Sequence, residues 1–188
     1  MSEGLDDKLA RALALSVAQQ PRANLQQLAR SAGISKATLY RISPTREGVI
    51  DLLMERASQH LQDALVRADL DAPPQAAALQ RLTEAVVQGR EYYLFWNHAH
   101  WTRLIDARNE DAGVQIPSFF GDALGTFFLN GQKAGVFRVD VPAMWLVRAY
   151  DSLLYAAMDA AQRGEIAPLG MASMVQKLFL EGAVDTRA

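Results

Sequence analysis

The chain has 188 residues, half of them apolar, a formal net charge of −2 and no cysteine. Such a composition supports a folded core, and the lack of cysteine excludes disulfides, thiolate metal sites and cysteine nucleophiles. The acidic start, MSEGLDDK, is not the basic-then-apolar pattern of a secretory signal, and no apolar run reaches the ~18 residues that span a bilayer. We therefore expect a cytoplasmic protein.

Nearly every segment shows the 3.6-residue helical period, and almost none alternates as a strand does. The predicted fold class is all-α, with about nine helices separated by Gly, Pro and capping residues. The first four are expected from Leu5 to before Pro21, from Asn24 to Gly33, from Ser35 to Pro44, and over 45–69. The others are expected at roughly 75–101, 102–110, 117–134, 142–163 and 168–182.

Charge is unevenly distributed between the two ends of the chain. Residues 1–47 carry seven Lys/Arg and four Asp/Glu, a balance of +3. Residues 48–188 carry twelve Lys/Arg and seventeen Asp/Glu, a balance of −5. A basic head on an acidic body favours a polyanionic partner for the head alone, although a difference of this size is also common by chance.

Two short helices joined through AGIS, with Gly33 at the turn, match the helix-turn-helix pattern. The second helix of this motif enters the DNA major groove, which is ~12 Å wide, so its outer face is expected to be small, basic and hydrogen-bonding. In SKATLYR, Leu39 is expected to point inward. The outward positions are Lys36, Ala37, Thr38, Tyr40 and Arg41. Short polar-faced helices also occur as solvated connectors, which is the alternative interpretation.

The run ANLQQLARSAGISKATLYRISPTREGVIDLL resembles the N-terminal domain of the TetR family of bacterial transcriptional regulators. The matching residues are Leu28, Ala29, Ala32, Gly33, Ser35, Thr38, Leu39, Tyr40, Pro44, Thr45, Arg46 and Glu47. The family usually has an aromatic residue where this chain has Ser43. Either Ile42 then packs in its place, or the head is less rigid.

The resemblance implies a DNA-binding domain at 1–47 and a helical domain for effector binding and dimerisation at 48–188. The DNA-binding residues it implies are Ser35, Lys36, Ala37, Thr38, Tyr40, Arg41, Thr45 and Arg46. Ala37 and Arg41 are the expected base contacts, and Lys36, Thr38, Tyr40, Thr45 and Arg46 are the expected phosphate contacts. Two heads on one dimer would read half-sites about one helical turn apart, ~34–36 Å.

The last two helices form the dimer interface in this family, and both have wide apolar faces here. GVFRVDVP, at 135–142, also resembles the loop that precedes the penultimate helix of family members. The interface residues expected are Leu146, Tyr150, Leu153, Leu154, Ala157, Ala161, Met171, Met174, Val175, Leu178 and Phe179. The same faces could instead pack inside one monomer, and periodicity does not separate the two arrangements.

Aromatic residues gather in EYYLFWNHAHW (91–101) and FFGDALGTFF (119–128). Such helices suit either an ordinary core or a pocket for an apolar or aromatic small molecule. The pocket residues expected are Tyr93, Trp96, Asn97, His100 and Tyr155. His98 and His100 are two apart and point in different directions on a helix, so no metal site is expected.

No nucleophile elbow, phosphate-binding glycine loop or HExxH motif occurs, so neither an enzyme nor a cofactor is expected. The function predicted is a homodimeric repressor that a small-molecule effector releases from a double-stranded DNA operator. The alternatives are an activator or an effector-independent regulator with the same head. An all-α ligand-binding protein or enzyme that does not act on DNA is a further alternative.

Overall fold

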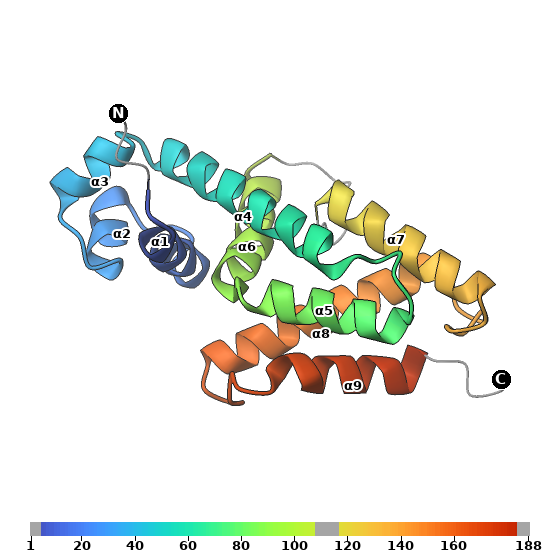
Figure 1. The fold of residues 1–188 in the computed structure, drawn as a ribbon. Helices are drawn as coiled ribbons and strands as arrows, with labels where there is room; N and C mark the ends of the chain where they lie inside the picture. Colours follow the sequence, from blue (N-terminus) through green and yellow to red (C-terminus); the bar gives the residue numbers. More distant parts are fainter. Residues whose placement is uncertain (1–4, 108–116, 184–188) are drawn as a thin grey trace. The chain divides into compact units, whose positions relative to one another are not determined.

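The computed structural model describes residues 5–107 and 117–183 (Figure 1). Within these ranges the chain forms nine α-helices, which confirms the all-α prediction. They are α1 (Asp7–Gln19), α2 (Leu25–Ser31), α3 (Lys36–Ile42), α4 (Arg46–Ala68), α5 (Gln75–Val87), α6 (Arg90–Ala107), α7 (Ser118–Lys133), α8 (Ala143–Gln162) and α9 (Met171–Ala183). None of the helices in the described ranges has the length and apolar character needed to cross a membrane.

One predicted helix boundary is wrong. α6 continues through residue 101, and the break lies between α5 and α6, at residues 88–89. Gly89 lies directly against the imidazole of His60, because a Cβ on Gly89 would be 2.2 Å from the His60 ring. This close approach of α4 is a tertiary contact, and the apolar period in the sequence does not register it.

The chain divides into two compact units, residues 1–60 with 89–115 and residues 61–88 with 116–188. This division differs from the expected boundary at residue 47, because the first half of α4 and the described part of α6 belong with the helix-turn-helix. The core of the first unit combines apolar residues of α1, α2, α3, α4 and α6, including Leu13, Leu28, Leu39, Leu53 and Phe95. The head is therefore built around more of the chain than its first quarter.

The core of the second unit is an aromatic cluster from α7, α8, α9 and the loop after α7. Phe128 is its centre, with ring centroids 5.2 Å from Phe127, 5.2 Å from Phe137 and 5.4 Å from Phe179. Tyr150 joins at 6.3 Å from Phe128, and its hydroxyl lies 2.9 Å from the Thr83 hydroxyl. Burial raises the pKa of Tyr150, which favours the neutral phenol that this hydrogen bond requires.

A polar network links α1 to the start of α6 within the first unit. Asp7 accepts hydrogen bonds from Arg11 Nε at 2.6 Å and from the Tyr92 hydroxyl at 2.8 Å. Arg11 also pairs with Glu91 at 3.2 Å, and its guanidinium lies 5.3 Å from the Tyr92 ring centroid. The hydrogen bond from Arg11 is the largest cause that holds the pKa of Asp7 below its usual value.

Asp7→Asn is expected to lower the free energy of unfolding at pH 7 by about 0.5–1 kcal/mol, since the exposed carboxylate is screened by solvent. Because the pKa of Asp7 is lower in the folded state, its contribution is present above the unfolded pKa of about 4 and is lost as the pH falls through the folded pKa. Urea titrations at pH 7 and at about pH 2.5 measure this change. The deficit should shrink at the lower pH, and Asp122→Asn, on the exposed face of α7, is the control. A deficit independent of pH would contradict the prediction.

Candidate DNA-binding surface

The helix-turn-helix is fixed by side-chain caps at both of its helix starts. Asn24 and Gln27 form a reciprocal capping box, with hydrogen bonds of 3.0 and 2.8 Å. Gly33, at φ +72°, ends α2 in a conformation that favours glycine. Ser35 then caps α3 by accepting from the Thr38 amide at 3.0 Å. Leu39 is fully buried and anchors α3 from below, so the predicted caps and the predicted inward residue are confirmed.

The outer face of α3 presents the side chains that the sequence placed there. Lys36, Ala37 and Arg41 are exposed, Tyr40 is 42% exposed, and Thr38 is half-buried. Lys36 Nζ lies 5.2 Å from the centroid of the Tyr40 ring, within cation–π range. A cation and a phenol therefore lie together on the outer face of α3.

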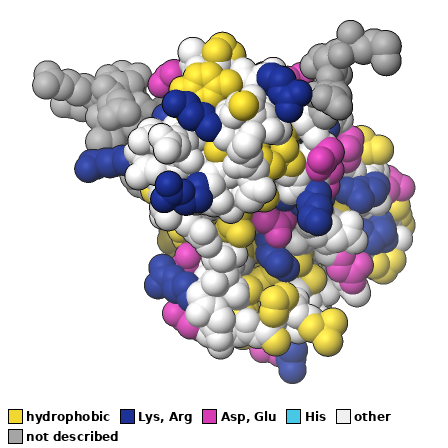
Figure 2. Space-filling model, turned by 90° about the vertical axis from the view of Figure 1, so that its left-hand side faces the viewer, with side chains coloured by type: hydrophobic (Ala, Val, Ile, Leu, Met, Phe, Trp, Pro, Cys, Tyr) yellow, Lys and Arg dark blue, Asp and Glu magenta, His cyan; other side chains and the backbone are white. Residues whose placement is uncertain are grey.

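The electrostatics of this face favour a polyanion. The sequence has no Asp or Glu from Lys8 to Arg46, a run that contains seven Lys/Arg. Figure 2 looks onto the side of Figure 1 on which α2 and α3 lie, and it shows Lys and Arg side chains spread over that face. A surface with this charge attracts the phosphates of a duplex and adds a salt-dependent contribution to binding.

The hydroxyl groups of Ser35, Thr38 and Thr45, which are expected DNA-binding residues, also have partners inside the chain. The hydroxyls of Ser35 and Thr38 lie 2.9 Å apart, and Thr45 Oγ1 accepts from the Gly48 amide at 3.0 Å, which confirms Thr45 as the cap of α4. These hydroxyls keep further hydrogen-bonding capacity for a phosphate.

Arg46 differs from its expected role. Its guanidinium is half-buried and donates to the main-chain carbonyls of Pro21 and Ala23. It therefore lies along the turn between α1 and α2, where the sequence had implied a phosphate contact. The motif match identified the residue type but gave no information about where a long side chain ends.

The structure also explains Ser43, where the family usually has an aromatic ring. Ser43 is 6% exposed, and its Oγ donates to the Thr45 carbonyl at 3.1 Å. A Cβ on Gly48 would lie 2.2 Å from that Oγ, so Ser43 and Gly48 close the corner between α3 and α4 as a pair of small residues. Ile42 is partly buried and packs against the core of the first unit.

The expected effector residues lie in both units. Tyr93, Trp96 and Asn97 are on α6 in the first unit, and Asn97 Nδ2 donates to the Tyr93 carbonyl at 3.1 Å. The buried indole N–H of Trp96 has no acceptor within the described part of the chain. Tyr155 is on α8 in the second unit, where burial, followed by the carboxylate of Asp159, raises its pKa. The side chain of His100 lies outside the described residues.

Most of the expected dimer residues are buried in the core of the second unit. These are Leu146, Tyr150, Leu154, Ala157, Met171, Val175 and Phe179. These seven side chains pack inside one chain, which is the alternative that the sequence left open. Their assignment to the dimer interface is therefore corrected. Leu153 and Ala161 are half-buried, Met174 is 36% exposed and Leu178 is 54% exposed.

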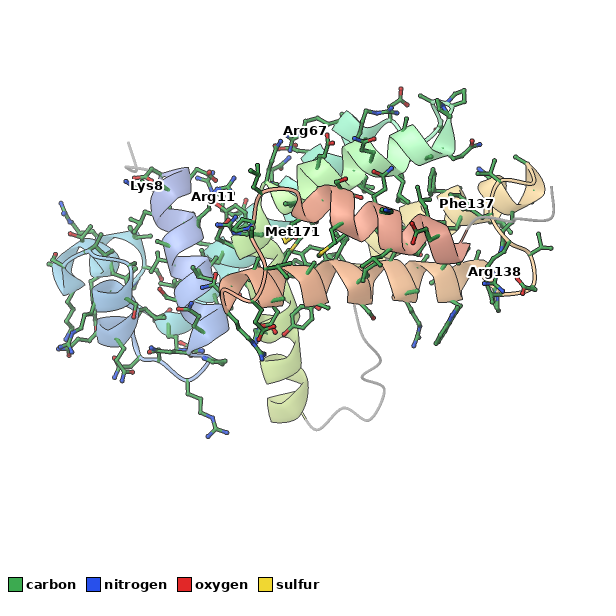
Figure 3. The ribbon with its side chains drawn as sticks, turned by 90° about the horizontal axis from the view of Figure 1, so that it is seen from below. Lys8, Arg11, Arg67, Phe137, Arg138 and Met171 are labelled. Atoms are coloured by element: carbon green, nitrogen blue, oxygen red, sulfur yellow. The ribbon has the colours of Figure 1, made fainter. Side chains whose placement is uncertain are left out.

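The apolar face that α8 and α9 leave open includes a residue that the sequence analysis missed. Trp145 is 60% exposed, and Trp145, Ala149 and Leu153 form a row with a spacing of four along α8. With Leu178 they line a groove of about 250 Å³, which Arg138 borders at one end. Figure 3 shows α9 running alongside α8, with Arg138 near one end of this pair. Arg138 is held by Asp140 at 2.6 Å and donates to the Gly182 carbonyl at 3.0 Å.

α3 is a capped helix of seven residues that follows a short helix and a glycine turn. It has one buried leucine, and its outer face is exposed and carries basic and hydroxyl side chains. These features define a helix-turn-helix DNA-binding protein. No family model matches the chain. The relatives that it resembles in sequence are helix-turn-helix regulators. It is 35% identical over 178 residues to the HTH-type transcriptional regulator NfxB of Pseudomonas aeruginosa, covering 95% of this chain and 94% of that protein.

A second relative is the HTH-type transcriptional repressor LfrR of Mycolicibacterium smegmatis, 28% identical over 152 residues, which cover 80% of this chain and 75% of LfrR. The crystal structure of the TetR-like regulator LfrR from Mycobacterium smegmatis in complex with proflavine matches with a TM-score of 0.64 and 22% identity over 95% of each chain. The chain belongs to the TetR family of helix-turn-helix transcriptional regulators, and it is a DNA-binding regulator of transcription.

Proposed function

We propose that the protein is a homodimeric repressor in which α3 of each copy reads one half-site of an operator. A small-molecule effector releases this repressor from the operator. The observation that carries this proposal is the exposed face of α3 on a head whose basic run has no acidic residue. The name of LfrR as a repressor supports the direction of regulation. Operators lie on the bacterial chromosome, so we place the protein in the cytoplasm.

We assign base contacts to Ala37 and Arg41, where a small side chain allows close approach and a guanidinium reaches the edge of a guanine. Lys36, Thr38 and Tyr40, with the cap hydroxyls of Ser35 and Thr45, contact phosphates and fix the register of the head. The exposure of Lys36, Ala37, Tyr40 and Arg41 on α3 supports this assignment.

Two substitutions on α3 are expected to have different effects on DNA binding. Arg41→Ala should cost about 1–3 kcal/mol of affinity and relax the preference at one base pair. Lys36→Ala should weaken binding to all sequences alike and reduce the slope of log K against log salt by about one. Fluorescence anisotropy measures both, with a duplex that the wild-type protein selects from a random-sequence pool.

Lys133→Ala, at an exposed position in the second unit, is the control for a change of net charge. If both α3 variants bound the selected duplex as the wild type does, α3 would not be the reading helix. A reporter gene behind the selected sequence gives the sign of regulation, and activation in place of repression would contradict the repressor proposal.

Effector binding is proposed for the aromatic part of α6, and the indole N–H of Trp96, which has no acceptor among the residues that the structure describes, supports it. A buried N–H without an acceptor is costly, and a ligand oxygen or nitrogen would remove that cost. Proflavine, which LfrR binds in its crystal structure, is the first probe. The dye should release the protein from its selected duplex, and Trp96→Phe should weaken this release. Equal release with both proteins would remove Trp96 from the pocket.

The groove between α8 and α9 is proposed to accept a second copy of this chain. Its lining is apolar apart from Arg138, and the exposed side chains of Trp145 and Leu178 border it. Exposed apolar side chains that gather beside an apolar groove typically mark a surface that another protein covers. Two heads brought together in this way can occupy two half-sites at once.

A further inference from the structure

Two arginines of α4 bind to the main chain at opposite ends of α1. Arg46, the first residue of α4, donates from Nε to the Ala23 carbonyl at 3.1 Å and from Nη2 to the Pro21 carbonyl. Arg56, further along α4, donates from Nη2 to the Leu5 carbonyl at 2.9 Å. The carbonyls of Pro21 and Ala23 follow α1, and that of Leu5 precedes it.

The two arginines are closer together along α4 than the length of the helix between their partners, and their long side chains reach past each end of α1. Arg46 and Arg56 are separated by about 15 Å along α4, and α1 is about 20 Å long, at 1.5 Å per residue. The start of α4 therefore lies at the C-terminal end of α1, and α4 reaches the N-terminal end of α1 through Arg56. Leu13 of α1 and Leu53 of α4 are fully buried in the same core between these two contacts.

Arginine is the residue that this arrangement requires at position 46. The carbonyls of Pro21 and Ala23 lie in the turn between α1 and α2, outside both helices, and one guanidinium donates to both. A planar guanidinium holds two carbonyls at once in a fixed geometry, whereas a lysine ammonium is a point charge on a flexible stem. Two of the five guanidinium donors of Arg46 are thus used inside the head, and they hold the side chain against the turn after α1.

We infer that Arg46 and Arg56 are positioning residues that clamp α1 to α4, so that the helix-turn-helix and the first half of α4 move as one rigid body. Arg46 acts on DNA binding through the orientation of α3 and makes no phosphate contact. The corner formed by Ser43 and Gly48 supports the same end of the clamp. The inference rests on the proposed reading of DNA by α3. In the proposed dimer, the two arginines would help to fix the distance between the two heads.

Arg46→Lys tests the clamp because it keeps the positive charge and loses the two-pronged geometry. We expect it to weaken binding to the selected duplex by about tenfold, as the loss of hydrogen bonds from a charged group would do, with the salt slope unchanged. We also expect poorer rejection of a duplex with one base pair inserted between the half-sites, because a loosened head tolerates altered spacing. Arg56→Lys, whose contact lies at the opposite end of α1, should reduce this rejection in the same way.

Arg30→Lys, at an exposed position of α2, is the matched control and should leave affinity and spacing selectivity at wild-type values. The inference is overturned if Arg46→Lys binds like the wild type while Arg46→Gln lowers the salt slope by about one, which is the signature of a phosphate contact. If Arg46→Lys failed to fold, a role limited to phosphate contact would be excluded, and Arg56→Lys would carry the spacing test.

The unfolding midpoint in urea separates this inference from the proposed function. A clamp residue should lower the midpoint when it is replaced by lysine, whether or not DNA is present, and Arg30→Lys should not. An unchanged midpoint for Arg46→Lys would contradict the clamp. Failure of the wild-type protein to select any duplex would contradict the reading of DNA by α3 while the midpoints still tested the clamp.

Discussion

Replacing Trp145 and Leu178 together by glutamate is expected to convert the proposed dimer into monomers and to weaken operator binding by about 100-fold or more. Both side chains are more than half exposed and border the groove between α8 and α9, so carboxylates there would be desolvated and would repel their copies in a second chain. The second head binds at a high effective concentration only while the two chains stay together, and this advantage is worth about 10²–10⁴ in affinity.

Sedimentation measures the mass, and anisotropy with the selected duplex measures the affinity. Val66→Glu is the matched control, because Val66 is an exposed apolar residue of α4 outside the groove. It should remain dimeric and bind as the wild type does. A double variant that remained dimeric would show that the chain pairs through another surface, and one that became monomeric with unchanged affinity would show that a single head is sufficient.

Phe128→Ala is expected to lower the free energy of unfolding by about 3–5 kcal/mol. Its ring is fully buried and contacts the rings of Phe127, Phe137, Tyr150 and Phe179 with edge-on or tilted geometry, so truncation removes apolar burial and leaves a cavity. Calorimetric or urea unfolding measures the loss, and the second unit should show it.

Leu129→Ala is the control for this core substitution. Leu129 is adjacent on α7 and 45% exposed, so its truncation should cost less than about 0.5 kcal/mol. Similar losses for the two variants would mean that the aromatic cluster is not the centre of the second core. Phe128→Leu, which keeps most of the buried volume, should recover a large part of the stability.

Local rules were sufficient for the helix-turn-helix. The caps at Asn24, Ser35 and Thr45 are hydrogen bonds between residues three apart, and they follow from the residue types at those spacings. The exposure of Lys36 and Arg41 follows in the same way, because one buried position, Leu39, sets the phase of a short helix. These contacts need no information from elsewhere in the chain.

The break between α5 and α6 was beyond such rules. The apolar pattern continues from one helix into the next, and Gly89, at the break, lies against the His60 ring, which is distant in sequence. The expected dimer face shows the same difficulty, because α8 and α9 each have apolar residues over a wide arc. Periodicity shows that an apolar helix face is buried, but only the packing shows whether the same chain or a second chain buries it.

The sequence by itself determined the all-α fold, the helix-turn-helix and the outward face of α3, because helix periods and caps depend on residues within one or two turns of each other. Tertiary structure alone decided that Arg46 turns back to Pro21 and Ala23, and that Tyr150 is core while Trp145 remains open. The physical reason is reach: a guanidinium or a ring at the end of a long side chain finds its partner across the fold, and only the packed chain fixes which partner lies there.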